Sequence, residues 1–280
     1  MEMKQLDHEQ VLALLPDRKQ DAHKGDFGKI LLLCGSRGYT GAAALAALGA
    51  LRSGAGLVYL GVPESIYAIE AVKLTEPIVF PLPDEGGLLS SEATKNITAL
   101  LPQMDAVVIG CGLGKSEGTL AVLAYVLQSF PGPVIVDADG INLLSQHKDI
   151  LRGRTCVTIL TPHAGEFSRL GYTGNRVQTA ITAAKELSCI LLLKGHETVI
   201  TDGETVFINP TGNPGMATGG CGDVLAGMIG ALVGQGIAPL MATAAAAWLH
   251  GKAGDLCAET IGQYGMLPSD MLSMLPRLMK

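Results

Sequence analysis

Short unbroken runs of hydrophobic residues recur along the chain, separated by glycine-rich turns and by longer segments of helical composition. The first run, Lys29 to Cys34, is followed by the turn GSRGYTG and by AAALAALGALRSG, whose alanine and leucine content favours a helix. A second run, Leu57 to Val62, completes a strand–helix–strand unit. Because parallel strands buried on both faces read as continuous apolar runs, this unit predicts two parallel strands.

The same alternation continues through the rest of the sequence. It predicts an α/β fold with a mostly parallel central sheet and helices on both faces, in which ligands bind beyond the carboxyl ends of the strands. We expect one domain over residues 1–280, with 1–25 as a helical extension (helix Asp7 to Leu15, on the outside) and a polar surface loop at Pro81 to Ser91. Further strands are expected at 106–109, 134–136, 157–160, 190–193 and 205–208, and helices near 117–128, 175–187, 224–233 and 241–257.

Composition narrows the class of protein. With 280 residues, 48% hydrophobic and 16% charged, the chain can bury a large core in a single domain. Its net charge of −6 argues against a nucleic-acid partner, because such proteins usually present a basic face. The start, MEMKQLDHEQ, has no apolar run, so we expect neither a signal peptide nor a membrane span, and a cytoplasmic location. The six cysteines form no C-x-x-C pair, so zinc and disulfides are not expected.

The segment from Asn209 to Gly234, NPTGNPGMATGGCGDVLAGMIGALVG, joins a glycine-rich loop to an apolar helix. Glycines allow positive φ and close approach of the backbone to a ligand, so that N–H groups can point at an anion. The N-terminus of the helix adds unpaired donors and the positive end of its dipole, which predicts a phosphate site. The glycines concerned are Gly212, Gly215, Gly219, Gly220 and Gly222.

Asp223 is the one acid in this loop. A carboxylate does not attract phosphate, so its presence indicates a general base that takes the proton of a hydroxyl attacking phosphorus. The alternative is that Asp223 only caps the helix. Cys221 lies next to the helix start, where a thiol can acquire a lowered pKa, but we interpret it as a loop filler because no histidine is near it in sequence.

Two other glycine clusters follow strands: Gly35, Gly38 and Gly41, and then Gly110, Gly112 and Gly114. Neither matches the dinucleotide fingerprint G-x-G-x-x-G, since Arg37 interrupts the first and Lys115 the second, which disfavours a hydride-transferring dehydrogenase. Both can still bind phosphates or ribose through backbone amides, although tight turns alone would need some of these glycines.

Polar residues end three further strands. His163 in TPHAGEF is expected to contact a ligand rather than to be only a satisfied polar group, and Glu166 can cap the following helix. Lys194 in KGHET can pair with a nucleotide phosphate or lie on a solvated hairpin edge, and the residues alone leave both open. Asp137 and Asp139 can hold Mg²⁺ through waters or cap a helix, which also stays open.

The string NPTGNPGMATGGCGD resembles the ADP- or ATP-dependent NAD(P)H-hydrate dehydratases of the ribokinase-like superfamily, whose G-x-G-D loop carries the catalytic base. TPHAGEF, KGHET and HGKAGD match as well, and the likeness runs from about Gly28 onward. It departs at Cys221, where the family usually has Thr or Ser, and at Gly140, where Ala is common. HGKAGD is expected to be a structural helix element near the loop. The resemblance implies the following residues: catalytic Asp223, Gly220, Cys221 and Gly222; substrate-binding Gly41, Ala42, Gly112, Gly114, His163 and Asp223; and nucleotide-binding Lys194, Gly195, His196, Glu197, Thr198 and Gly222.

The resemblance also implies an activity. It is the dehydration of the S epimer of hydrated NADH or NADPH, with ADP or ATP as co-substrate and Mg²⁺, in metabolite repair. A homo-oligomer is expected, with a tetramer as the form that the resemblance implies, and the partner epimerase is expected on a separate chain because this one leaves no room for it. The alternatives are a kinase of the same superfamily, for a hydroxymethyl-pyrimidine, thiazole or pyridoxal-type alcohol, and a nucleotide-sensing protein without catalysis.

Overall fold

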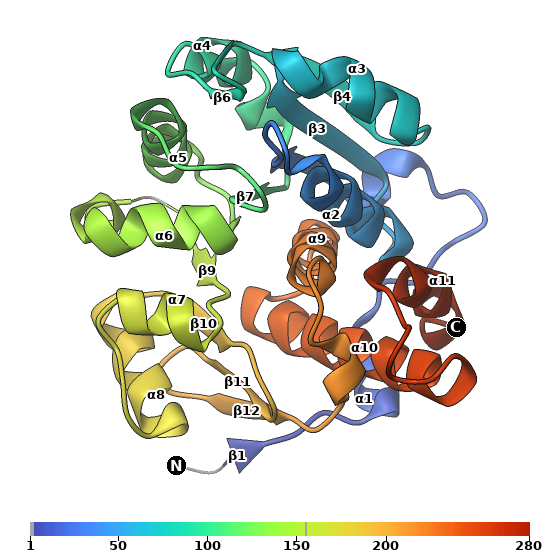
Figure 1. Cartoon of the computed structure of the whole chain (residues 1–280). Coiled ribbons are helices and arrows are strands. Elements are labelled where there is room, and N and C mark those ends of the chain that lie inside the picture. The colour runs from blue at the N-terminus through green and yellow to red at the C-terminus, as the bar shows by residue number, and fades with distance from the viewer. Residues whose placement is uncertain (1–2, 155) are drawn as a thin grey trace.

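Ten strands form one central sheet in the computed structural model, which describes residues 3–154 and 156–280 (Figure 1). The order across the sheet is β1-β12-β11-β10-β9-β8-β7-β2-β3-β4. Only β11 runs antiparallel to its neighbours. The strands are β1 (Met3–Lys4), β2 (Lys29–Leu33), β3 (Leu57–Pro63), β4 (Ile78–Leu82), β7 (Ala106–Ile109), β8 (Val134–Val136), β9 (Thr158–Leu160), β10 (Ile190–Leu193), β11 (Thr198–Thr201) and β12 (Val206–Asn209).

The predicted mostly parallel sheet is confirmed, and each strand predicted from an apolar run is present within about one residue. The burial of β2 shows why these runs are unbroken. Ile30 and Leu32 enter one hydrophobic core, whereas Leu31 and Leu33 enter the other. Because helices cover both faces, no position from Ile30 to Leu33 is left for a polar side chain, and the charged Lys29 stands only at the half-buried start of the strand.

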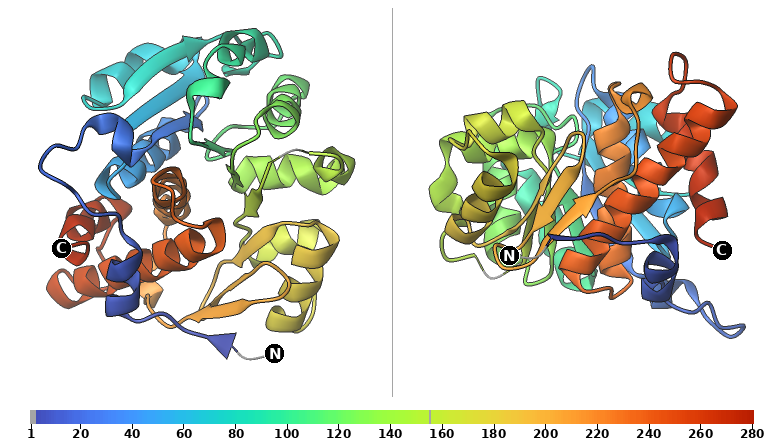
Figure 2. Two further views of the ribbon diagram at one scale, coloured as in Figure 1. Left: turned by 180° about the vertical axis from the view of Figure 1, so that it is seen from behind. Right: turned by 90° about the horizontal axis from the view of Figure 1, so that it is seen from below.

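Helices lie on both faces of the sheet (Figure 2). Residues of α2, α9, α10 and α11 pack in one core, and residues of α4, α5, α6 and α8 pack in the other. The helices are α1 (His8–Leu14), α2 (Thr40–Arg52), α3 (Glu64–Lys73), α4 (Ala93–Thr98), α5 (Glu117–Ser129), α6 (Ala138–Gln146), α7 (Ala164–Arg169), α8 (Arg176–Glu186), α9 (Cys221–Gly234), α10 (Pro239–Thr260) and α11 (Pro268–Leu278).

The prediction of a plain surface loop at Pro81 to Ser91 is wrong. The chain leaves the edge strand β4 and forms a small hairpin of β5 (Asp84–Glu85) and β6 (Leu88–Leu89). Leu82 and Leu89 are both buried. The acids and glycines make this segment polar on average, so its average polarity does not indicate that two of its leucines are buried and anchor it to the sheet.

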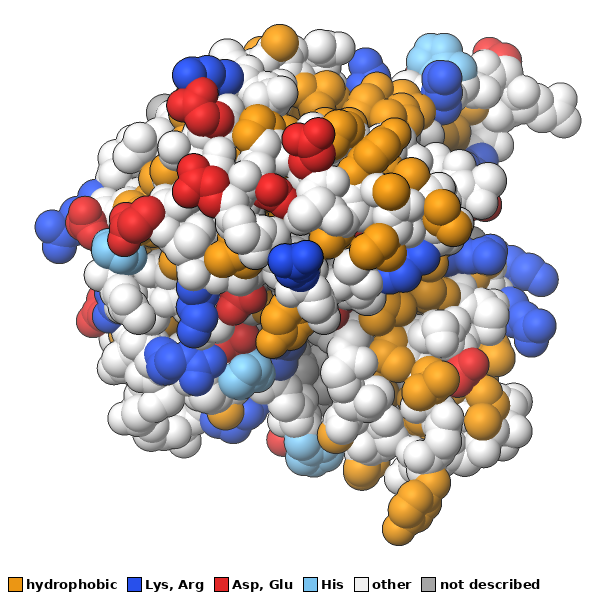
Figure 3. All heavy atoms as spheres, turned by 45° about the horizontal axis from the view of Figure 1, so that its top comes forward, with side chains coloured by type: hydrophobic (Ala, Val, Ile, Leu, Met, Phe, Trp, Pro, Cys, Tyr) orange, Lys and Arg blue, Asp and Glu red, His pale blue; other side chains and the backbone are white. Residues whose placement is uncertain are grey.

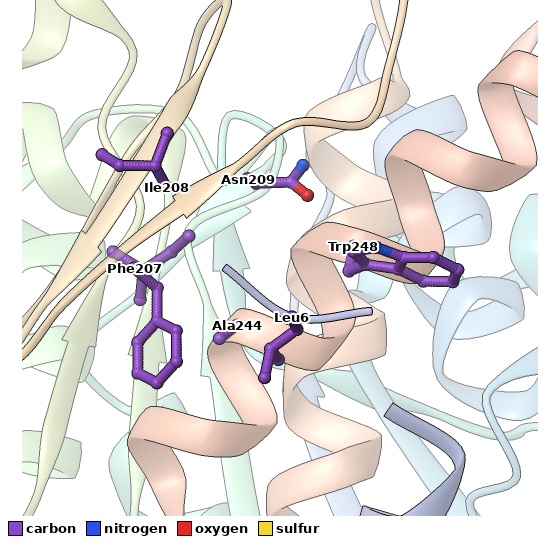
Figure 4. Close-up of a pocket in the computed structure, with 7 residues that line it drawn as sticks. Leu6, Phe207, Ile208, Asn209, Ala244 and Trp248 are labelled. Atoms are coloured by element: carbon purple, nitrogen blue, oxygen red, sulfur yellow. The ribbon is translucent and has the colours of Figure 1, made fainter. Parts of the chain in front are cut away.

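The N-terminal segment does more than form the expected helix. Its helix α1 is present, capped by Asp7, but β1 precedes it and extends the sheet in parallel with β12. His8 stacks on Trp248 with ring centroids 5.3 Å apart, and its Nε2 lies 2.9 Å from the Leu278 carbonyl oxygen. Leu6 helps to close a void of about 10 Å³ against β12 and α10 (Figure 4), roughly the room of one water molecule.

No helix among the described residues is both long and apolar enough to cross a membrane. On the face drawn in Figure 3, acidic, basic and hydrophobic side chains are interspersed.

Candidate active site

The carboxyl ends of β8 and β10 bring together two charged side chains that lie 57 residues apart in sequence. Lys194 Nζ donates to Asp137 Oδ1 at 2.6 Å, and Thr161 Oγ1 donates to the same oxygen at 2.8 Å. The Asp137 side chain is 2% exposed and that of Lys194 is 20% exposed. Lys194 therefore points inward, and the alternative that it lies on a solvated hairpin edge is wrong.

The ion pair keeps Lys194 charged. Burial alone would lower the pKa of Lys194, but the carboxylates of Asp137 and Glu166 outweigh it and raise that pKa above its ordinary value. Glu166 Oε2 lies 4.0 Å from Lys194 Nζ. The site thus holds a fixed cation at neutral pH.

The N-terminus of α9 faces this pair. Gly220 is the N-cap residue, with φ of 103°, and a Cβ added at Gly222 would lie 3.2 Å from Lys194 Nζ. The N–H groups of Gly220, Cys221 and Gly222 donate none of the hydrogen bonds found among the described residues. Free donors, a helix dipole and a lysine therefore converge, which is the chemistry of an anion site. Of the five loop glycines, only Gly212 and Gly220 have positive φ.

Asp223 lies in the first turn of α9 and does not cap it, so the alternative reading as an N-cap residue is wrong. Burial raises the pKa of Asp223 to about 6, helped by the negative charge of Asp137 and opposed by Cys111 and Lys194. A carboxyl group with a pKa near neutrality suits a general base better than an ordinary aspartate does. One such group in a strand-end site is a candidate catalytic residue.

Cys111, Asp137 and Asp223 form a compact cluster whose ligand atoms all lie within 4.8 Å of one another. The neighbouring Cys34 and burial raise the pKa of the Cys111 thiol well above its ordinary value, so the thiol stays protonated. Asp137 already accepts from Lys194. Two carboxylates and a neutral thiol do not form an oxygen cage for Mg²⁺, but they fit an ion held mainly by nucleotide phosphates and waters.

Asp139, the second candidate for a metal, is not part of this cluster. Its Oδ2 accepts from the backbone N–H of Gly114 at 2.9 Å. Asp137 occupies the N-cap position of α6 without a capping bond from its side chain. Asp139 thus fixes the turn of Gly110, Gly112 and Gly114 that follows β7, called here the second glycine turn, while Asp137 faces Lys194.

The Cys221 thiol is not activated. Burial raises its pKa to about 11, so the lowered pKa that a helix start can produce is absent here. Its sulfur contacts Met271 Sδ at 3.9 Å. This agrees with the interpretation of Cys221 as a filler, because its neutral thiol is buried against Met271 and the backbone of Thr218.

The two glycine turns that follow β2 and β7 touch one another. A Cβ added at Gly112 would lie 2.7 Å from the Cβ of Ala42, and Ser36 Oγ donates to the Gly112 carbonyl at 2.7 Å. Gly114 is tied to Asp139, and Gly41 lies exposed in the first turn of α2. The structure thus brings Ala42, Gly112 and Gly114 together beside Cys111.

His163 caps α7. Its Nδ1 accepts from Gly165 N at 2.9 Å and Glu166 N at 3.4 Å, and Glu166 Oε2 accepts from His163 N at 2.8 Å. Because Nδ1 is an acceptor, the ring proton lies on Nε2, and the side chain is 54% exposed. His163 is both a satisfied cap and a potential donor, and the predicted capping role of Glu166 is confirmed.

Among the residues of KGHET, only Lys194 is in contact with the cluster of Cys111, Asp137 and Asp223, through its ion pair with Asp137. Gly195, His196 and Glu197 are exposed in the turn between β10 and β11, and Thr198 begins β11. Their contact with a nucleotide stays a prediction.

HGKAGD supports the anion loop from α10, as predicted for a structural helix element. Asp255 accepts from Gly212 N and from Asn213 Nδ2, each at 3.1 Å. His250 was not singled out by sequence reasoning. It is buried, its Nε2 has no hydrogen-bond partner among the described residues, and burial lowers its pKa to about 4, an effect partly offset by the Cys221 backbone. A lone histidine within an alanine-rich helix was the available signal.

Neither the void of Figure 4 nor a larger cavity of about 300 Å³ between the β5–β6 hairpin and α5 contains a predicted site residue. The candidate site is defined by its side chains and helix terminus rather than by these hollows.

Comparison with known proteins gives a consistent result. The family model described as NAD(P)H-hydrate dehydratase matches residues 30–277. The chain is 43% identical over 275 residues to a bifunctional NAD(P)H-hydrate repair enzyme of Moorella thermoacetica, covering 95% of this chain and 52% of the relative. It is 36% identical over 256 residues to an ADP-dependent (S)-NAD(P)H-hydrate dehydratase of Neisseria meningitidis, covering 88% of this chain and 82% of that protein. The chain spans about half the length of the bifunctional relatives it matches.

Solved structures show the same likeness. A Bacillus subtilis ADP/ATP-dependent NAD(P)H-hydrate dehydratase, co-crystallised with ATP and Mg²⁺, superposes with a TM-score of 0.84 at 31% identity, covering 99% of this chain and 98% of that one. A ribokinase-like superfamily protein of Enterococcus faecalis gives 0.87 at 30% identity, with coverage of 99% and 95%. The predicted ribokinase-like fold is confirmed.

Proposed function

The chain belongs to the NAD(P)H-hydrate dehydratase family, and from that premise we propose that it dehydrates the S epimer of hydrated NADH or NADPH with ADP or ATP as phosphoryl donor. The relative from Neisseria meningitidis carries that activity in its name. The observation that supports the proposal most is Asp223, a carboxyl group with a pKa of about 6 at the N-terminus of α9, beside a lysine.

Asp223 is the proposed general base. Hydroxide is a poor leaving group from the hydrated ring, whereas phosphate is a good one. Asp223 takes the proton of the ring hydroxyl, whose oxygen attacks the terminal phosphorus, and the bond from that phosphorus to AMP (or to ADP, when ATP is the donor) breaks. The ring nitrogen lone pair then expels phosphate, and loss of a proton from the neighbouring carbon restores the double bond of the reduced nicotinamide.

The loop of Gly220, Cys221 and Gly222 is the proposed anion hole. Its free N–H groups would hold the transferring phosphoryl group as charge develops, and removing one such donor commonly costs about 3 kcal/mol of barrier. Lys194 would add a fixed positive charge on the same side.

The adenine nucleotide is proposed to lie over Lys194, Gly195, His196, Glu197, Thr198 and Gly222. Mg²⁺, present with ATP in the Bacillus subtilis structure, would neutralise phosphate charge when bound. Asp137 would reach it through water, and Asp139 is a weaker candidate because Gly114 occupies one of its oxygens. The hydrated dinucleotide is proposed to contact Gly41, Ala42, Gly112, Gly114 and His163, beside Asp223.

The wider setting follows from the same proposal. We infer a homo-oligomer, with a tetramer as the expected form, and an epimerase that supplies the S epimer. The bifunctional names of several relatives support the pairing with an epimerase.

A cytoplasmic location accords with six free cysteines, which a reducing compartment maintains. Residues 1–280 are proposed to act as one domain, and the mass in solution, measured by light scattering, tests the assembly.

A small-molecule kinase would use the same base, so the products decide between the two functions. With hydrated NADH and ADP, the proposal expects equal amounts of NADH, AMP and inorganic phosphate, separated by chromatography. A stable phosphorylated alcohol formed from a pyrimidine, thiazole or pyridoxal-type substrate, with no NADH from the hydrate, would establish the kinase instead.

A further inference from the structure

Tyr39 is a large aromatic residue that the proposed chemistry does not yet use. It lies between β2 and α2, and it is 62% exposed. It occupies the N-cap position of α2, but its side chain makes no capping hydrogen bond. Single exposed aromatic residues are ordinary on protein surfaces, so its exposure alone carries no conclusion. Its location does.

The backbone of Tyr39 is fixed against the second glycine turn. A Cβ added at Gly112, where φ is +59°, would lie 2.9 Å from Tyr39 Cβ and 3.1 Å from its carbonyl oxygen. Tyr39 N donates to the Ser36 carbonyl at 2.9 Å, and Ser36 Oγ donates to the Gly112 carbonyl. The start of the side chain is therefore held on the Gly112 turn, while the ring is left to solvent.

The Tyr39 side chain begins close to the carboxylate of Asp223, the proposed general base. Gly112 directly follows Cys111, whose sulfur lies within 4.8 Å of an oxygen of Asp223. One residue step along the backbone is about 4 Å, so the base of the Tyr39 side chain lies on the order of 10 Å from the Asp223 carboxylate. A dihydropyridine ring and its ribose, placed with the ring hydroxyl at Asp223, span a distance of that order.

We propose that the ring of Tyr39 packs against the nicotinamide–ribose half of the hydrated dinucleotide, as a substrate-binding residue; this inference rests on the proposed function. An aromatic face offers a broad apolar contact to a flat ring and its sugar at little cost in side-chain entropy. Because the contact uses the ring face, the phenolic hydroxyl is not required.

The test compares Tyr39→Ala and Tyr39→Phe with the wild type. Removing an aromatic contact to a ring commonly weakens binding by about 1–3 kcal/mol, so Tyr39→Ala should raise KM for the hydrated dinucleotide about tenfold. Its kcat should stay within about twofold, since the contact is the same in the ground and transition states. Tyr39→Phe should keep the wild-type KM. Tyr67→Ala, which removes an exposed tyrosine on α3, is the matched control and should change neither value.

A second readout separates this inference from the proposed function. Binding of the product NADPH, followed by its fluorescence, should be about tenfold weaker in Tyr39→Ala than in the wild type, at an unchanged melting temperature. An active wild type with equal KM and equal NADPH affinity in Tyr39→Ala overturns the inference alone. If the wild type is inactive, the proposed function fails, and the NADPH titration still decides for or against Tyr39, an absence of NADPH binding counting against it.

Discussion

The ionised carboxylate of Asp223 lowers the stability of the folded protein, and the position of this residue explains why. Burial, together with the negative charge of Asp137, raises its pKa to about 6, against 3.8 for an ordinary aspartate. A group that is harder to ionise in the folded protein than in the unfolded chain lowers stability when it is ionised. Such local conflict is typical of a functional group rather than of a structural one.

The raised pKa of Asp223 predicts an acid limb in the activity profile. A general base must be deprotonated, so kcat/KM should fall about tenfold per pH unit below pH about 6 and level off above it. Rates measured across that range check the limb. A midpoint near the ordinary aspartate value would show that another group limits the rate.

Asp223→Asn should increase stability while it removes activity. The proton bound to the folded protein stabilises it below the unfolded pKa, and this contribution is lost as pH rises through about 6. At pH 7–8 the neutral amide should therefore add up to about 3 kcal/mol to the unfolding free energy in urea, while kcat falls by about 10²–10⁴. A destabilised variant would contradict the burial account.

Cys221→Ser should keep activity within about threefold. Burial raises the pKa of the thiol to about 11, so it is neutral at physiological pH, and its sulfur lies against Met271. Iodoacetamide at pH 8 should accordingly leave the wild type active. Rapid inactivation prevented by ADP would contradict this, because it would show a reactive thiol in the site.

At the scale of elements, α9 is held in place by glycines rather than by large side chains. A Cβ added at Gly227 would lie 2.0 Å from the Ala46 carbonyl oxygen of α2, and one added at Gly49 would lie 2.5 Å from the Val224 carbonyl oxygen. The two helices therefore pack with their backbones in close approach. This packing fixes the direction in which the N-terminus of α9 points.

Gly222→Ala tests the approach of that terminus to the lysine. The new methyl group would lie 3.2 Å from Lys194 Nζ and 3.6 Å from Asp137 Oδ2, so we expect KM for the nucleotide to rise about tenfold. Helix stability should not fall, since alanine is favoured over glycine within helices by about 1 kcal/mol. Gly219→Ala, where nothing lies within 4 Å of the added Cβ, is the control and should have a smaller effect.

The Lys194–Asp137 pair joins the ends of β8 and β10. Lys194→Met would leave the buried Asp137 carboxylate without its cation, which should lower the unfolding free energy by about 3–5 kcal/mol. Adding Asp137→Asn should recover much of that loss, as a double-mutant cycle in urea would show. Lys185→Met, at an exposed site on α8, is the matched control. Equal effects for both lysines would contradict the buried pair.

For the whole molecule, the central sheet could be predicted because burial on both faces leaves a clear signal. Ala106–Ile109 and Ile190–Leu193 are strands whose every residue is buried, and their sequences are wholly apolar. The edge strand Ile78–Leu82 was missed, since four of its five residues are exposed or half-buried and one of them is Pro81. An edge strand contacts a neighbour on one side only, so its pattern is weaker.

The candidate site also has a part that the sequence indicates and a part that it does not. Residues at strand ends could be recognised one at a time, because each follows an apolar run or a glycine turn. Their pairing could not, since Lys194 and Asp137 meet only after the sheet has formed. The capping roles left open for Asp137 and Asp223 were equally undecidable, because local sequence does not reveal which side chains a helix terminus faces.

We propose that this chain uses Asp223 and an adenine nucleotide to restore hydrated NADH or NADPH. The most direct measurement is the near-ultraviolet absorbance of reduced nicotinamide after mixing the protein with the hydrate, Mg²⁺ and either ADP or ATP. We expect a rise in absorbance that requires the nucleotide and is lost in Asp223→Asn. No rise with either nucleotide, or an equal rise in Asp223→Asn, would contradict it.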